Sequence, residues 1–148
     1  MHAHLRLDGR AQAELLRDIV NRAALRDRGG AGVVVFDLDG TVCDNRPRTA
    51  RIFRELAEHW THRAPEAAAR LRGAVPTDIV YRIVDSLARI GVTDVELVAE
   101  AERYWRERFF FDEYLKHDVE VPGAARFARA VHDAGGTIVY LTGRDLPN

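Results

Sequence analysis

The residues of this sequence that are most clearly suited to catalysis or metal binding are two aspartates at the end of an apolar run. Asp37 and Asp39 follow the apolar residues 33–36 and precede Gly40. A short apolar run without polar alternation is typical of a strand buried on both faces of a parallel sheet. Asp37 would then lie at the carboxyl end of this strand, where open α/β sheets bind their ligands. Because residues two apart in an extended chain point to the same side, we expect both carboxylates to face one site.

The closeness of the two carboxylates predicts a bound cation. Two such groups repel each other, and burying both without a partner would cost several kcal/mol. Mg²⁺ resolves this, because it binds one or two carboxylates together with carbonyl, water and substrate phosphate oxygens. We therefore predict a Mg²⁺ site with Asp37 and Asp39 as ligands. The alternative, aspartates that merely cap a turn, fits a single Asp better than a pair followed by Gly40 and Thr41.

Residues 33–41, Val-Val-Val-Phe-Asp-Leu-Asp-Gly-Thr, resemble the first motif of the haloacid dehalogenase superfamily, which is four apolar residues followed by DxDGT. The resemblance implies a Rossmann-like core, Mg²⁺ and an aspartyl-phosphate intermediate, with Asp37 as nucleophile and Asp39 as general acid and base. A proton donor helps to expel an alkoxide from a phosphate ester, whereas a halide needs none. Asp39 therefore favours hydrolysis of a phosphorylated small molecule over dehalogenation.

A second apolar run, residues 137–141, ends in Thr142-Gly143-Arg144 and resembles the second motif of the same superfamily. By this resemblance Thr142 would hydrogen-bond the transferred phosphoryl group. The Gly143 amide could do the same, as backbone donors commonly do for phosphate. Arg144 could neutralise the phosphate or merely cap a helix end, and the sequence leaves both interpretations open.

Between the two apolar runs lies a stretch with helical periodicity, whose apolar faces could bury one another as a small bundle. Many members of the superfamily insert a helical cap at this place. The resemblance thus implies an α/β fold: a Rossmann-like parallel sheet, of which only the first part is present, with an inserted α-helical cap. The predicted domains are a core of residues 1–44 and 119–148 and a cap of residues 45–118. The predicted helices span residues 11–28, 47–60, 65–73, 77–90, 93–109 and 122–134, with a capping box from Thr93 to Glu96.

The composition narrows the class of protein. The 22 basic and 23 acidic residues give a formal net charge of -1, without the basic excess of a typical nucleic-acid-binding protein. The single Cys43 rules out an intramolecular disulfide and suits a reducing compartment. No apolar stretch has the length of a membrane span, and the N-terminal residues lack the apolar segment of a signal peptide. We expect a cytoplasmic protein with no membrane or nucleic-acid partner, and the sequence does not predict its oligomeric state.

Two motifs that usually complete the catalytic set of the superfamily cannot be placed among these 148 residues. They are a Lys or Arg that balances the phosphate charge and an acidic pair that completes the Mg²⁺ site. Two parallel strands alone would also leave both sheet edges unpaired. We therefore expect this chain to be the amino-terminal portion of a longer phosphatase-like protein, inactive by itself.

Two other functions stay open beside the Mg²⁺-dependent phosphatase. One is a catalytically inactive remnant that binds a partner through its helical stretch. The other is a receiver-like phosphoacceptor domain, against which the Asp-Gly-Thr of residues 39–41 and the helical insert both argue.

Overall fold

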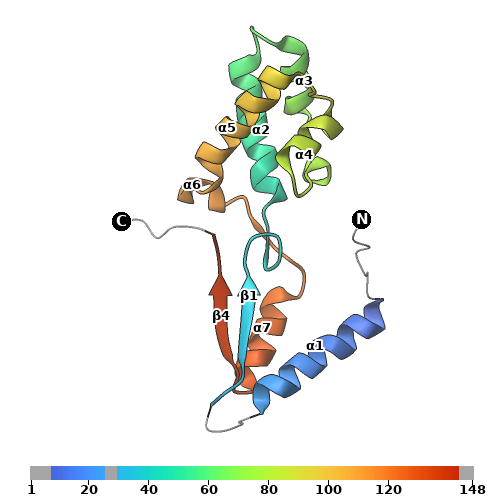
Figure 1. Ribbon diagram of the computed structural model, residues 1–148, viewed down its shortest axis with the longest axis vertical. Coiled ribbons are helices and arrows are strands. Elements are labelled where there is room, and N and C mark those ends of the chain that lie inside the picture. Colours follow the sequence, from blue (N-terminus) through green and yellow to red (C-terminus); the bar gives the residue numbers. More distant parts are fainter. Residues whose placement is uncertain (1–7, 26–29, 144–148) are drawn as a thin grey trace. The chain divides into compact units, whose positions relative to one another are not determined.

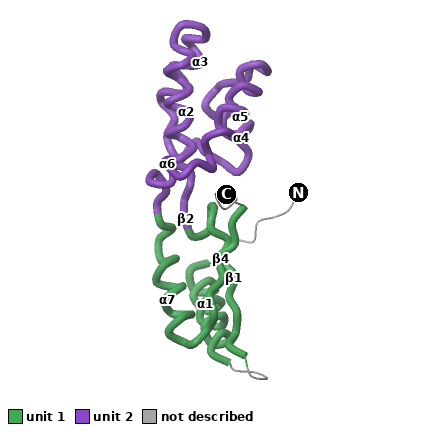
Figure 2. The backbone as a smooth tube through the Cα atoms, turned by 90° about the vertical axis from the view of Figure 1, so that its left-hand side faces the viewer, with its two compact units in different colours: residues 1–42, 120–143 green, residues 43–119, 144–148 purple. Residues whose placement is uncertain are grey.

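The computed structural model describes residues 8–25 and 30–143, which form two compact units (Figure 2). The α/β unit consists of the described residues up to 42 together with 120–143, and the helical unit consists of residues 43–119. In the described part of the chain, no helix is long and apolar enough to cross a membrane. In chain order the elements are α1 (Gly9–Ala24), β1 (Val33–Asp37), β2 (Cys43–Asp44), α2 (Arg46–Trp60), α3 (Pro65–Arg72), the 3-10 helix η1 (Pro76–Asp78), α4 (Ile83–Ile90), α5 (Val95–Phe109), α6 (Asp112–Leu115), β3 (Val119–Glu120), α7 (Ala124–Asp133) and β4 (Thr137–Leu141).

Strands β1 and β4 form a parallel pair in the α/β unit (Figure 1). Val33 lies opposite Thr137, and Asp37 lies opposite Leu141. Parallel strands cannot be joined by a tight turn, so the chain must cross over between them, and here α7 precedes β4 on the return. The predicted fold class, an α/β fold with a Rossmann-like parallel sheet, is confirmed.

Helices α1 and α7 cover one face of this sheet. Phe36, from β1, is buried in a cluster with Ala23 of α1 and Val131 of α7, and Val34 and Ile138 pack against it. The side chains that alternate with these point to the opposite face. The apolar core of the α/β unit therefore lies on one side of the sheet.

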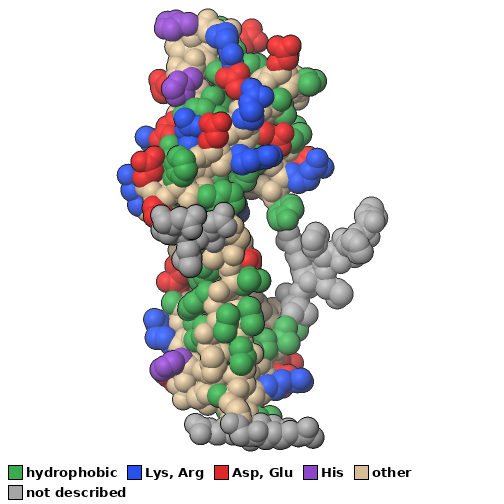
Figure 3. Space-filling view, turned by 60° about the vertical axis from the view of Figure 1, so that its left-hand side comes forward, with side chains coloured by type: hydrophobic (Ala, Val, Ile, Leu, Met, Phe, Trp, Pro, Cys, Tyr) green, Lys and Arg blue, Asp and Glu red, His purple; other side chains and the backbone are tan. Residues whose placement is uncertain are grey.

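The opposite face of the sheet is open among the described residues. Val33 and Val35 are 60% and 58% exposed, and Val139 and Leu141 of β4 are exposed as well. Figure 3 shows hydrophobic side chains gathered on the surface of the α/β unit. The prediction that β1 is buried on both faces is therefore wrong for the described chain, because α1 and α7 pack on the same side.

Helix α1 comes closest to the rest of the α/β unit at three small residues, Ala23, Gly32 and Gly136. An added Cβ at Gly32 would lie 2.7 Å from the Cα of Ala23, and one at Gly136 would lie 2.9 Å from the Ala23 Cβ. The Gly32 N–H also donates to the Ala23 carbonyl oxygen at 3.3 Å. Two glycines thus allow the last turn of α1 to approach the sheet at backbone distance.

Helix α1 ends at Ala24, and the predicted helical residues 26–28 lie outside the described residues. Leu25 takes an extended conformation, and its N–H donates to the Arg22 carbonyl oxygen at 3.1 Å. The helical hydrogen-bond pattern therefore stops at Ala24.

The helical unit has its own apolar core. Trp60 and Leu56 from α2, Leu71 from α3 and Leu87 from α4 are almost fully buried together. A smaller cluster of Ile52, Phe109 and Tyr114 lies beside it, from α2, α5 and α6. The apolar faces predicted from helical periodicity are thus buried against one another.

Helix α4 begins at Ile83, later than the predicted start at Thr77. A short 3-10 helix and a bend come first. Buried Ser86 holds the bend, since its Oγ accepts from the Val80 N–H at 2.9 Å and donates to the Arg82 carbonyl oxygen at 3.1 Å. These bonds satisfy backbone groups that a continuous helix would otherwise have paired.

Helix α5 is capped by Asp94 and not by the predicted Thr93. The Asp94 carboxylate accepts from the N–H groups of Glu96 and Leu97, both at 3.0 Å. A carboxylate at this position satisfies two of the free amides of the first turn and also suits its positive dipole. The predicted helix is present, but its N-cap lies one position later than predicted, and Leu97 at the third helical position cannot complete a capping box.

We expect Gly136→Ala to destabilise the protein, because the new methyl group would meet Ala23 and Val131 at 2.9 Å. Overpacking of this kind costs about 1–3 kcal/mol of unfolding free energy. Denaturant melts followed by circular dichroism measure the change. Gly30→Ala is the matched control, since a Cβ there has nothing within 4 Å, and it should stay close to the parent. Equal stabilities for the two variants would contradict the close contact.

Tyr114 of the helical unit is buried and donates its hydroxyl proton to Glu55 Oε2 at 2.6 Å. Burial, together with the adjacent Glu55 carboxylate, raises the pKa of Tyr114 to about 12. The folded protein thus favours the neutral phenol more than the unfolded chain does, where a Tyr pKa is about 10. The resulting stabilisation is complete below pH 10 and is lost as the pH rises toward 12.

Tyr114→Phe should therefore flatten the fall in unfolding free energy between about pH 10 and pH 12. Burial also raises the pKa of Tyr104, so part of the slope should remain. Denaturant melts at several pH values across this window give the slope. Tyr81→Phe is the control, because the Tyr81 side chain is fully exposed. A slope that is unchanged in Tyr114→Phe would show that this phenol does not cause it.

Candidate active site

Asp37 ends β1 at its carboxyl edge, and a glycine turn brings a hydroxyl back to it. Gly40 has a φ of 83°, a conformation that favours glycine. The turn is closed by hydrogen bonds from the N–H groups of Thr41 and Val42 to the Leu38 carbonyl oxygen, at 3.3 and 3.1 Å. As a result the Thr41 Oγ1 donates to Asp37 Oδ2 at 3.0 Å. One carboxylate oxygen of Asp37 is thereby held in place.

Asp39 meets the end of the neighbouring strand. The Leu38 N–H donates to the Leu141 carbonyl oxygen at 3.0 Å, which carries the parallel pairing one step beyond β1. Thr142 follows Leu141, and its Oγ1 lies 3.5 Å from Asp39 Oδ2. This distance is at the long end for a hydrogen bond, so the contact is weak.

The structure thus places the predicted residues Asp37, Asp39 and Thr142 at one edge of the parallel sheet. Gly143 follows Thr142 and is exposed there. Arg144 lies outside the described residues. Asp37 is exposed and Asp39 is partly buried, so a ligand can reach both side chains. The catalytic, metal-binding and substrate-binding roles of these residues remain predictions.

The donor atoms at this edge are of the type that Mg²⁺ prefers. Asp37 and Asp39 offer carboxylate oxygens, and the main chain between them offers carbonyl oxygens. Among the described residues no group of three or more His, Cys, Asp or Glu side chains could hold a metal ion. Carboxylate and carbonyl oxygens suit a hard cation that keeps water and phosphate oxygens as its other ligands.

The sequence did not identify the role of Thr41, which belongs to the first motif but was given no function. Its hydroxyl donates to the Asp37 carboxylate across a turn of four residues. The spacing of Asp37 and Thr41, four positions apart around the turn at Gly40, is the signal that could have revealed this contact. The direction of the hydroxyl depends on the positive φ of Gly40, which a residue pattern alone does not fix.

A further carboxylate near the first motif, Asp44, is engaged elsewhere. Arg46 Nε donates to Asp44 Oδ1 at 2.8 Å, and Arg46 Nη2 donates to Asp44 Oδ2 at 2.6 Å. These hydrogen bonds hold the pKa of Asp44 below its usual range. Both carboxylate oxygens are occupied by the guanidinium, so we do not include Asp44 in the site.

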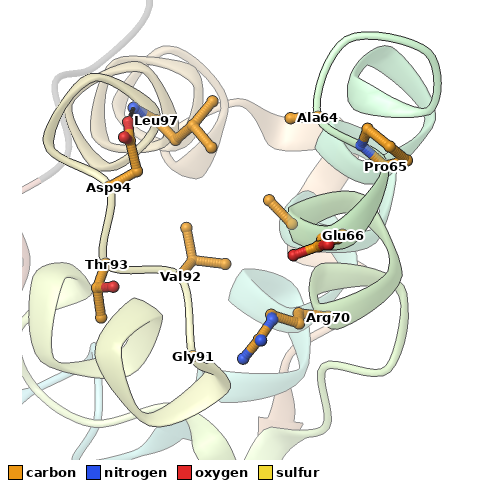
Figure 4. A pocket seen from close by; sticks show the side chains of 10 residues that line it. Ala64, Pro65, Glu66, Arg70, Gly91, Val92, Thr93, Asp94 and Leu97 are labelled. Atoms are coloured by element: carbon orange, nitrogen blue, oxygen red, sulfur yellow. Dashed lines mark hydrogen bonds between the residues drawn. The ribbon is translucent and has the colours of Figure 1, made fainter.

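The helical unit contains a separate cavity of about 390 Å³ between α3 and the turn that leads into α5 (Figure 4). Val92 and Leu97 give it apolar walls, and Glu66 and Arg70 of α3 lie at its side. The Asp94 carboxylate beside it caps α5. We assign no function to this cavity.

The model of one protein family, haloacid dehalogenase-like hydrolase, matches residues 32–148. The chain belongs to this family. The match covers well over half of the chain, begins just before β1 and includes both motifs. The family membership predicted from residues 33–41 is therefore confirmed.

Membership in the haloacid dehalogenase-like hydrolases supports a hydrolase activity, and members of this family typically use Mg²⁺. Helix α1 precedes the matched residues, so the family model does not account for it. No curated protein and no solved structure gives a significant match to the chain.

Proposed function

We propose that this haloacid dehalogenase-like hydrolase is a Mg²⁺-dependent phosphomonoester hydrolase that acts on a phosphorylated small molecule. The observation that carries the proposal is the contact of Asp39 with Thr142 beside Asp37 at the carboxyl edge of β1 and β4. A nucleophile, a proton donor and a phosphate-binding hydroxyl are thereby within reach of one ligand.

Asp37 is the nucleophile in this proposal. One of its carboxylate oxygens attacks phosphorus, the bond from phosphorus to the leaving oxygen breaks, and an aspartyl-phosphate forms. The hydrogen bond from Thr41 engages Oδ2, which leaves Oδ1 for the attack. Thr41 therefore orients the nucleophile.

Asp39 serves as the general acid and then as the general base. In its protonated form it gives a proton to the leaving oxygen, and as a carboxylate it then takes a proton from the water that hydrolyses the aspartyl-phosphate. The Thr142 hydroxyl, which lies 3.5 Å from Asp39 Oδ2, donates to a phosphoryl oxygen. The Gly143 amide adds a second donor.

Asp37, through its carboxylate, and Asp39, through its main-chain carbonyl, would hold the Mg²⁺ ion. When bound, the ion offsets the repulsion between an attacking carboxylate and a phosphate dianion. We assign the helical residues 45–118 to a cap that excludes water and selects the leaving group. The α/β residues 1–44 and 119–148 form the core in this assignment.

Asp37→Asn should abolish turnover of an aryl phosphate by the full-length gene product, because an amide oxygen is a poor nucleophile. We expect a loss of about 10⁴-fold or more in kcat, with the fold retained. Rapid acid quench followed by mass spectrometry should also find phosphate on the Asp37 peptide of the parent and none in the variant.

Asp133→Asn, on the exposed surface of α7, is the control for the loss of one carboxylate and should keep parental turnover. Near-normal turnover of Asp37→Asn, once deamidation back to Asp is excluded, would remove Asp37 from the role of nucleophile.

Asp39→Asn should slow hydrolysis of an alkyl phosphate more than hydrolysis of an activated aryl phosphate. A poor leaving group depends on the donated proton, and general acid catalysis contributes about 10²–10⁴-fold. Steady-state rates on both substrates, together with Mg²⁺ affinity, test this. Equal losses on the two substrates would indicate that Asp39 serves the metal site and not proton transfer.

A further inference from the structure

A fully buried arginine lies in the first turn of α2. Arg48 Nε donates to Asp118 Oδ1 at 2.7 Å, and Arg48 Nη2 forms a second, short contact with Asp118 Oδ2. Arg48 Nη1 donates to the Phe109 carbonyl oxygen at 2.7 Å, and the guanidinium carbon lies 4.2 Å from the centroid of the Phe109 ring. The buried charge is thus met by a carboxylate, a carbonyl and an aromatic face.

Arg48 and Asp118 lie where the chain enters and leaves the helical unit. Arg48 follows β2 by a few residues, and Asp118 directly precedes β3. Strands β2 and β3 pair with each other, and the Val121 N–H donates to the Val42 carbonyl oxygen at 2.9 Å. The incoming and outgoing segments are therefore joined both by the backbone and by the ion pair.

We propose that the Arg48–Asp118 pair is a clasp that closes the base of the helical unit, meaning residues 43–48 and 115–119. The clasp keeps the incoming and outgoing segments side by side, so that the helices between them behave as one body. This inference goes beyond the proposed function and does not depend on it, since Arg48, Asp118 and Phe109 all lie in the helical unit.

The kind of interaction favours this role over simple stabilisation. A buried ion pair stabilises a fold little more than well-packed apolar residues would, because both charges lose their water. An ion pair requires a more exact geometry than an apolar contact does, since the planar guanidinium must meet both carboxylate oxygens. The pair therefore specifies which two segments meet.

The buried apolar residues of the helical unit form two clusters, and the partly buried Tyr104 and Trp105 pack against both. The clasp contacts Phe109, which belongs to the small cluster with Ile52 and Tyr114. Leu71 and Leu87 belong to the larger cluster of the bundle. Loss of the clasp should therefore expose the base while the bundle around Leu87 stays folded.

The test is amide hydrogen exchange, followed by mass spectrometry, on the 148-residue chain. Arg48→Met leaves the Asp118 carboxylate without its guanidinium, so exchange at the base should become about 10²-fold faster. Exchange in α4 should change by less than about threefold. Arg72→Met is the control, because its ion pair with Glu58 in the helical unit is exposed, and it should leave the base unchanged.

A core variant distinguishes the clasp from general stability. Leu87→Ala removes a fully buried side chain of α4, so it should speed exchange in α4 at least as much as at the base. If Arg48→Met gives that same pattern, Arg48 is an ordinary core residue and the proposal is overturned.

Two milder variants keep the test decisive if Arg48→Met does not fold. Arg48→Lys keeps the charge but cannot contact both carboxylate oxygens, and Asp118→Asn keeps the shape but loses the charge. Each should speed exchange at the base by at least about fivefold while α4 stays protected. Unchanged exchange at the base in both variants would overturn the proposal.

Discussion

The parallel pairing of β1 with β4 is the constraint on which the rest of this structure depends. Two parallel strands cannot be joined by a hairpin, so the chain has to leave the carboxyl end of β1 and return through α7 to the start of β4. The helical unit lies in the chain that makes this excursion. The register, with Asp37 opposite Leu141, also decides that the residues after the two strands emerge together. Both the modular organisation and the candidate site follow from one set of backbone hydrogen bonds.

A slip of one residue in this register would change both the core and the site. Val34 and Phe36 would exchange faces with Val33 and Val35, and the cluster with α7 would lose its largest side chain. Asp39 would lose its contact with Thr142 at the same time. The same register therefore places the apolar side chains against α1 and α7 and brings Asp39 next to Thr142. Packing in the core thus also determines the geometry of the candidate site.

The sequence predicted the parts of this arrangement that depend on local pattern. The strands and most helices follow from apolar periodicity, and the placement of Thr142 beside Asp37 and Asp39 follows from the resemblance of residues 137–143 to the second motif of the superfamily. The start of α4 was missed because it depends on the buried hydroxyl of Ser86. The pairing of Arg48 with Asp118 was missed because the two residues are 70 positions apart and neither lies in a motif. The hydroxyl of Thr41 was missed because backbone dihedrals at Gly40 set its direction.

The attachment of α1 has a consequence for how such a protein can diversify. The helix precedes the family-matched residues, and its buried contact is concentrated at Ala23, between Gly32 and Gly136. The closest approach is made by backbone and methyl groups, and Val20 packs beside it against the same apolar cluster. Most other side chains of α1 are exposed, so substitutions there should leave the helix docked in the same place. A bulky residue at Ala23, Gly32 or Gly136 would instead push the helix away from the sheet, so sequence variation in α1 should be confined to its exposed positions.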